Sequence, residues 1–254
     1  MKSFTIKKGN CYKLLKQIPD QYIDLILTDP PYNLNPYSTG NLKMNWRKDF
    51  NNDIANWDKE TLDIDTLLDE YKRIISPTGN IFIFTTYNLL GEFHKFFDPE
   101  FDTFQIMVWH KTNPTPKLRK TSFLNSCELI CCIWNKGHTW NFSKQNRMHN
   151  FFESPICMGK ERLKHPTQKP VKLLKHIINI ASNEGDIVLD NFMGVGSTGE
   201  ASLQLGRQFI GFEIDANYFN QANKRLNRIE QENLYESRKS RKSFRIDNFC
   251  PDHP

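Results

Sequence analysis

The stretch DIVLDNFMGVGSTGEA, residues 186–201, decides the expected fold of this chain. Its first five residues, DIVLD, contain a short run of branched and aliphatic residues, which is typical of a buried strand. Gly194, Gly196 and Gly199 follow, and glycine lets a backbone turn tightly and approach a ligand closely. The segment TGEASLQLG then has the composition of a helix. The stretch therefore predicts a strand, a glycine loop and a helix, which is the repeating unit of an α/β sheet.

An acidic residue follows the glycine loop at the end of the next predicted strand. This strand, RQFIGFE, ends at Glu213, where a carboxylate can accept hydrogen bonds from ribose hydroxyls. The loop and the acid together predict a nucleoside-binding half-site. GVGSTG at residues 194–199 has the letters of G-x-G-x-x-G, but it does not follow the first strand of the predicted sheet, so the loop does not fit a dinucleotide fingerprint. The spacing also excludes a phosphate-binding P-loop, because no G-K-[ST] follows the glycines.

Strand-like and helical segments alternate along the rest of the chain. The predicted strands are 4–10, 22–28, 79–87, 104–111 and 128–134, and the predicted helices are 11–18, 64–75, 89–97, 169–182 and 216–230. Alternation of this kind predicts a twisted, mainly parallel sheet with helices on both faces. A length of 254 residues suits one large α/β domain.

A second unusual stretch, LTDPPYNL at residues 27–34, ends the strand YIDLIL. Proline lacks the N–H that a sheet ladder needs, so Pro30 and Pro31 end the strand directly behind Asp29. Ligands of open α/β sheets bind beyond the carboxyl ends of the strands. If this strand lies next to the strand before the glycine loop, Asp29 faces the bound nucleoside.

Composition excludes several classes of protein. Six cysteines without paired C-x-x-C spacing predict neither a disulfide scaffold nor a metal site. We expect a cytoplasmic protein, because no apolar run is long enough to span a membrane and the N-terminus lacks a secretion signal. The net charge of +5 is compatible with nucleic acid but does not identify it. Five basic residues in 237–245 indicate either a solvated terminus or a phosphate-binding arm.

Three motifs together carry a resemblance to a known family. DPPY, then HPTQKP at residues 165–170, then the F-x-G-x-G loop resemble the permuted β group of S-adenosylmethionine-dependent DNA amino-methyltransferases. The resemblance implies a Rossmann-like fold with a circularly permuted motif order, loop insertions and a seven-stranded, mainly parallel sheet with one antiparallel pairing. It implies a single methyltransferase domain over residues 1–232, with candidate DNA-recognition loops at 33–60 and 112–164. A basic, mobile tail is then expected over residues 233–254.

The resemblance also implies a cofactor site, carried over residue by residue. The implied S-adenosylmethionine-binding residues are Asn10, Cys11, Asp29, Thr167, Lys169, Asp190, Phe192, Gly194, Gly196, Ser197, Thr198 and Glu213. Two positions depart from the family pattern. Asn10 stands where the family often has Asp, and Asn191 stands where Pro is usual.

The implied catalytic residues are those of the DPPY motif: Asp29, Pro30, Pro31 and Tyr32. An exocyclic amino group on a base is a poor nucleophile, because its lone pair is delocalised into the ring. The Asp29 carboxylate and the Pro30 carbonyl can accept its two protons and aim the lone pair at a methyl group. Tyr32 can stack on the base, which must leave the duplex to reach these groups.

The expected function is site-specific methylation of adenine N6 in DNA, because DPPY favours adenine within the family. N4-cytosine methylation, an RNA or protein methyltransferase and a non-catalytic DNA-binding relative stay open as alternatives. Cytosine C5 methylation is disfavoured, since the Pro-Cys dipeptide typical of those enzymes is absent. The expected partners are DNA, a cognate restriction endonuclease and a second copy of the chain.

Overall fold

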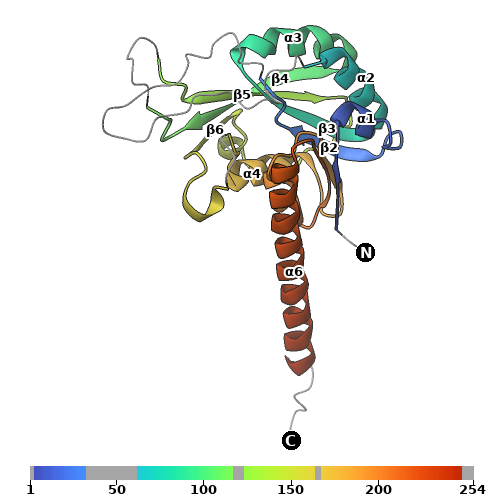
Figure 1. Ribbon diagram of the computed structural model, residues 1–254, viewed down its shortest axis with the longest axis vertical. Helices are drawn as coiled ribbons and strands as arrows, with labels where there is room; N and C mark the ends of the chain where they lie inside the picture. The colour runs from blue at the N-terminus through green and yellow to red at the C-terminus, as the bar shows by residue number, and fades with distance from the viewer. Residues whose placement is uncertain (1–2, 33–61, 117–122, 164–166, 248–254) are drawn as a thin grey trace, which may run out of the picture.

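A mixed β-sheet forms the centre of the protein in a computed structural model, which describes residues 3–32, 62–116, 123–163 and 167–247 (Figure 1). Its eight strands are β1 (Phe4–Lys8), β2 (Ile23–Thr28), β3 (Ile75–Thr85), β4 (Thr103–Lys111), β5 (Cys127–Trp134), β6 (Phe151–Ser154), β7 (Ile187–Asp190) and β8 (Gln208–Glu213). Their order across the sheet is β1-β8-β7-β2-β3-β5-β4-β6. The predicted α/β architecture is confirmed.

The direction of the strands changes in the second half of the sheet. The first five strands in the spatial order are parallel to one another, whereas β5 is antiparallel to both β3 and β4. The eighth strand, β6, exceeds the seven that were expected and pairs in parallel with β4. It is only four residues long and lies in a polar, basic stretch. Its sequence therefore carries no periodic signal, and the sequence predicts an irregular segment over residues 135–164.

Helices cover both faces of the sheet. One face carries α1 (Cys11–Leu15), α2 (Ile64–Ile74) and α3 (Tyr87–Phe97), and the other carries α4 (Val171–Ala181), α5 (Ser197–Gln204) and α6 (Ala216–Asp247). Short 3-10 turns lie at Asp98–Glu100, Gln145–Arg147 and Gly159–Glu161. Successive side chains of a strand point to opposite faces, so Leu25 and Leu27 of β2 pack into one core and Ile26 into the other. This two-sided burial explains why the strands read as continuous apolar runs.

Helix α6 extends well beyond the predicted helix of residues 216–230. Its 32 residues contain no proline or glycine, and Ile229 is the last buried apolar residue among the helix side chains that the structure describes. The rest of the helix stands away from the body of the protein, and Leu234 and Tyr235 are exposed (Figure 1). The chain is thus helical at residue 233, where a separate tail was predicted to begin.

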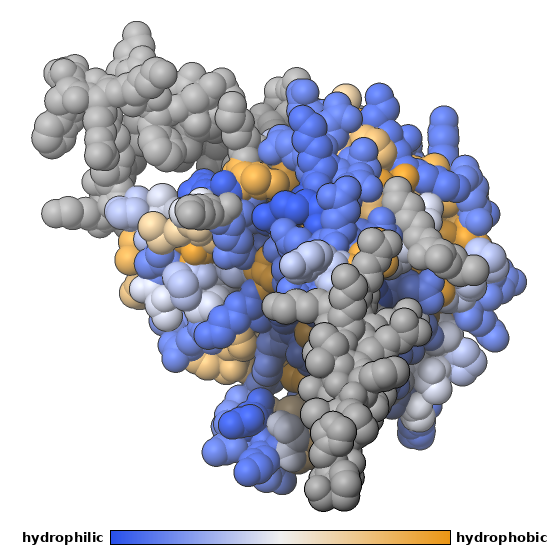
Figure 2. All heavy atoms as spheres, turned by 90° about the horizontal axis from the view of Figure 1, so that it is seen from below, coloured by the Kyte–Doolittle hydropathy of each residue, from blue (hydrophilic) through white to orange (hydrophobic). Residues whose placement is uncertain are grey.

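The surface seen from the end of α6 is mostly hydrophilic, with separate apolar patches (Figure 2). No helix in the described ranges is long and apolar enough to cross a membrane.

Candidate functional site

The two motif-bearing strands, β2 and β7, are neighbours at the centre of the sheet. Leu25 is paired with Val188 and Ile26 with Leu189, in parallel register. The DPPY motif and the glycine loop therefore leave the sheet at the same edge, as the sequence predicted on the condition that the strands were adjacent. A buried hydrogen bond of 2.9 Å from the Thr28 hydroxyl to Asp190 Oδ1 ties the two strand ends together.

A single pocket collects nearly all of the predicted site residues. It is lined by Gly9, Asn10, Cys11, Tyr12, Asp29, Pro30, Pro31, Tyr32, Leu62, Thr167, Gln168, Lys169, Asp190, Asn191, Phe192, Met193, Gly194, Val195, Ser197, Thr198, Phe212, Glu213, Ile214 and Tyr218. Of the predicted residues only Gly196 is missing from this lining. Residues 33–61 and 164–166, which include all of the first candidate recognition loop and part of HPTQKP, lie outside the described residues.

Gly196 shapes the loop from behind the pocket. Its φ of +78° is left-handed, a conformation that glycine adopts without strain. A Cβ at this position would lie 3.1 Å from the Cβ of Ala222 on α6. The glycine therefore allows α5 to start close against α6, and it sets the path of the loop.

Asp190 supports the loop through hydrogen bonds inside the protein. Its Oδ1 accepts from the Thr28 hydroxyl and, at 3.1 Å, from the backbone N–H of Phe192, while its Oδ2 accepts at 2.7 Å from the Thr198 hydroxyl. Burial raises the pKa of the Asp190 carboxyl to about 7, although these three hydrogen bonds act to lower it. Ser197 is likewise bonded internally, accepting at 3.0 Å from Arg225. These side chains line the pocket, and their polar groups hold the loop in place.

Glu213 and the segment after β1 lie side by side at the next strand end. Lys8 is paired with Glu213, and the Gly9 N–H donates to the Glu213 carbonyl at 2.9 Å. The Glu213 carboxylate accepts from the Asp215 N–H at 2.7 Å, and burial raises its pKa. Asn10 is the N-cap of α1 and accepts from the Lys13 N–H. Both predicted contacts to the nucleoside thus reach one end of the pocket.

Cys11 follows directly on the buried side of this segment. Burial raises the pKa of its thiol to about 12, so the group is neutral at physiological pH. Thr167 lies exposed at the rim of the pocket.

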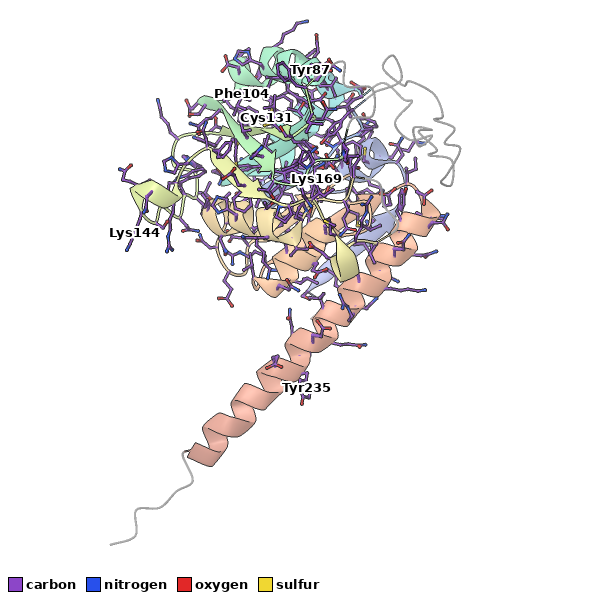
Figure 3. The ribbon with its side chains drawn as sticks, turned by 90° about the vertical axis from the view of Figure 1, so that its left-hand side faces the viewer. Tyr87, Phe104, Cys131, Lys144, Lys169 and Tyr235 are labelled. Carbon is purple, nitrogen blue, oxygen red and sulfur yellow. The ribbon has the colours of Figure 1, made fainter. Side chains whose placement is uncertain are left out.

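The opposite end of the pocket is built around Asp29. The Tyr32 hydroxyl donates to Asp29 Oδ1, and the Lys169 ammonium donates to Asp29 Oδ2 at 2.6 Å and lies 3.1 Å from the Tyr32 oxygen. Lys169 was predicted as a contact to the cofactor, but its ammonium is bonded to the predicted catalytic carboxylate. It lies within the body of the protein, among closely packed side chains (Figure 3). Burial raises the pKa of the Asp29 carboxyl, and the Lys169 charge only partly opposes this effect.

Sequence reasoning missed Glu128, at the start of β5. Its carboxylate lies 3.0 Å from the Lys169 ammonium and 2.6 Å from that of Lys111. The signal was present, because Glu128 is the one charged residue of the otherwise apolar strand CELICCIW. Trp109 of β4 is buried and donates to Ser154 at 2.9 Å.

Comparison with known proteins identifies the family. A family model for N6/N4 DNA methylases, described as DNA methylase, matches residues 23–224. The chain belongs to this family. The methyl donor of this family is S-adenosylmethionine.

Individual relatives agree with the family assignment. The methylase is 34% identical over 249 residues to the Type II methyltransferase M.HinfI of Haemophilus influenzae, covering 89% of this chain and 69% of that protein. It is similar to the crystal structure of the M1.HpyAVI–SAM complex, with a TM-score of 0.65, 28% identity and coverage of 88% and 100% of the two chains. The PvuII cytosine-N4-specific DNA methyltransferase shares the fold, with a TM-score of 0.64, 16% identity and coverage of 90% and 93%.

The pocket of the methylase fits a nucleoside-like cofactor. Asn191 accepts from the buried Tyr71 hydroxyl at 2.7 Å, and its buried side-chain nitrogen lies beside the Cys11 thiol. A thiol is a weak acceptor, so an acceptor on a ligand in the pocket would satisfy this buried donor better. This amide, the Glu213 carboxylate and the apolar walls formed by Phe192 and Phe212 together suit a ligand with a base, a sugar and a charged tail.

Proposed function

We propose that this DNA methylase transfers a methyl group from S-adenosylmethionine to the exocyclic N6 amino group of adenine in DNA. One observation carries the proposal: the Asp29 carboxylate and the prolines behind it line the same pocket as the glycine loop and Glu213. A proton acceptor for the target amino group is thereby placed beside the methyl donor. The DPPY form of the motif supports adenine over cytosine.

Within this proposal the cofactor supplies an electrophilic methyl group on a sulfonium sulfur. Glu213 and the glycine loop are the parts of the chain that would hold the cofactor, Glu213 through the ribose hydroxyls. Asp29 and the Pro30 carbonyl accept the two amino protons of the base, so that the nitrogen lone pair is available for the methyl group. Formation of the nitrogen–carbon bond would break the carbon–sulfur bond and leave a neutral thioether, and one amino proton would pass to the Asp29 carboxylate.

The target base reaches Asp29 only after it leaves the duplex. Tyr32 stacks on the extruded base, and the rigid prolines keep both acceptors in position. Target selection belongs to residues 33–60 and 112–164, within a methyltransferase domain of residues 1–232. The proposal includes a cytoplasmic setting, a cognate restriction endonuclease and a homodimer.

The test combines an Asp29→Ala variant with product analysis. Tritiated S-adenosylmethionine is incubated with unmethylated bacterial genomic DNA, RNA or protein, and labelled DNA is digested to nucleosides. We expect N6-methyladenine with the wild-type chain. We expect a loss of ~10²–10³-fold or more in turnover for the variant, because a preorganised acceptor is removed.

Asp69→Ala, an exposed acid on α2, is the matched control and should leave turnover unchanged. Detection of labelled N4-methylcytosine instead of N6-methyladenine would show that the target base is cytosine. Labelled RNA or protein without labelled DNA would refute a DNA substrate. Turnover above about a tenth of wild type in Asp29→Ala would remove Asp29 from the catalytic role.

A further inference from the structure

The Lys169 ammonium lies between two carboxylates, Asp29 and Glu128. It is 2.6 Å from Asp29 Oδ2 and 3.0 Å from Glu128 Oε2, and its side chain is only 5% exposed. The other Glu128 oxygen lies 2.6 Å from the Lys111 ammonium. Two cations and two anions therefore alternate along a partly buried row, and their charges cancel.

Both oxygens of Asp29 are engaged in this arrangement. The Tyr32 hydroxyl donates to Oδ1, and Lys169 donates to Oδ2. A target amino group that donates to Asp29 must therefore replace one of these donors. The ammonium is the better candidate to move, because a second carboxylate already lies within its reach.

The second carboxylate is already a partner of the ammonium. Glu128 Oε2 is buried and lies 3.0 Å from the Lys169 nitrogen, and despite this burial the Lys169 charge lowers the pKa of the Glu128 carboxyl. The distance suits a charge-assisted hydrogen bond, so the ammonium is shared between the two carboxylates. The rings of Phe84 and Tyr32 lie 4.9 and 5.3 Å from the same nitrogen and favour a cation there.

We propose that Lys169 and Glu128 are positioning residues that form a charge gate on Asp29. Before the base arrives, Lys169 pairs with the Asp29 carboxylate and holds it aimed into the pocket. When the target amino group donates to Asp29, the ammonium gives up its hydrogen bond to Asp29 and remains paired with Glu128 Oε2. This inference rests on the role of Asp29 in the proposed function, and it replaces the predicted cofactor contact of Lys169.

The charges around Asp29 give the gate a distinctive pH dependence. Lys169, Tyr32, Glu128 and Asp190 face or surround this carboxylate. The positive charge of Lys169 lowers the pKa of Asp29, whereas the negative charge of Glu128 raises it. Removing one or the other residue should therefore move the acid limb of the pH–rate profile in opposite directions.

The experiment measures kcat from pH 5 to 9.5 with full-length protein, saturating S-adenosylmethionine and unmethylated bacterial genomic DNA. Lys169→Met should move the acid limb upward by roughly 1 pH unit or more, because an opposite charge is removed from beside a carboxylate. Its turnover should recover at high pH. Its affinity for S-adenosylmethionine, measured by calorimetry, should stay within about twofold of wild type, which also shows that the variant is folded.

Glu128→Gln should move the acid limb downward and lower the plateau rate about tenfold, because Lys169 is then left with Asp29 as its only anionic partner. Glu92→Gln, at an exposed position on α3, is the matched control and should change neither quantity. Loss of cofactor affinity in Lys169→Met without a shifted limb would overturn the gate in favour of a cofactor contact. Shifts in the same direction for Lys169→Met and Glu128→Gln would also overturn it.

These outcomes are separate from a failure of the proposed function. If the product is N4-methylcytosine, the target base is cytosine, and the same pH–rate profile would be measured on cytosine. The cytosine amino group would donate to Asp29 in the same way, so the test of the gate would be unchanged. An active Asp29→Ala enzyme would instead refute the acceptor role of Asp29, and the proposed gate would be refuted with it.

Discussion

Two aspartates at neighbouring strand ends, Asp29 and Asp190, show how surroundings divide the work of identical side chains. Asp190 accepts three hydrogen bonds from groups of the protein itself, so its oxygens hold the loop. Asp29 has one neutral donor and one cationic donor, and its side chain keeps 21% exposure toward the pocket. A ligand can replace a donor of Asp29 far more easily than it can enter the closed environment of Asp190.

Glu213→Ala should weaken S-adenosylmethionine binding. Loss of a charged acceptor to a ribose hydroxyl costs ~1.5–3 kcal/mol, which corresponds to a dissociation constant about 10 to 100 times larger. DNA affinity should change little. Calorimetry on the variant and on the exposed control Glu232→Ala measures the difference. An unchanged cofactor affinity would point to Asp215 as the ribose acceptor.

Single site residues could be predicted from the sequence where a motif determined both the residue type and its position in the fold. Asp29 and Glu213 each end a strand, and strand ends are easy to locate. Glu128 was missed because its importance comes from its ion pair with Lys169, which is 41 positions away in the chain and belongs to a different motif. Long-range charge pairs of this kind have no local pattern.

At the scale of elements, the Asp190 hydrogen bonds join β2, β7 and α5. The carboxyl prefers its protonated form in the folded protein, since burial raises its pKa to about 7. Its contribution to stability is therefore fully present below the unfolded pKa near 4 and is lost as the pH rises through about 7. The loss amounts to roughly 2–4 kcal/mol at most.

Asp190→Asn should remove this loss, because an amide of the same shape carries no charge. We expect the difference in free energy of unfolding, variant minus wild type, to increase between pH 5 and pH 8. Denaturant titrations at both pH values measure this, with Asp69→Asn as a surface control. Parallel pH dependence in wild type and Asp190→Asn would contradict the assigned burial effect.

Elements with strong periodic signals were predictable, and those defined by tertiary contact were not. The strands of the parallel half and helices α2, α3 and α4 follow apolar patterns that match the cores they enter. Strand β6 exists through its pairing with β4, and its four residues show no alternation. The sequence of the far half of α6 shows no regular apolar repeat, so the predicted helix stopped near Ile229, the last buried apolar residue among its described side chains.

At the scale of the whole molecule, the net charge of +5 is distributed unevenly, and 237–245 holds five basic residues on α6. We expect deletion of everything after Leu234 to leave DNA affinity and its salt dependence unchanged, since we favour the solvated interpretation of this segment. Every phosphate interaction that the deletion removed would lower the log–log salt slope by roughly 0.9. Binding titrations at several salt concentrations measure the slope. A drop of about two or more would show that the segment is a phosphate-binding arm.

The projecting part of α6 also governs how the molecule moves through solution. The helix is about 48 Å long at 1.5 Å per residue, whereas a compact chain of this length has a radius of gyration of ~18 Å (Figure 3). A rod attached to a globule experiences more hydrodynamic drag than a sphere of the same mass. A monomer of 29.9 kDa should therefore elute early from a size-exclusion column and resemble a heavier particle. The number of subunits must accordingly come from light scattering, which reports mass independently of shape.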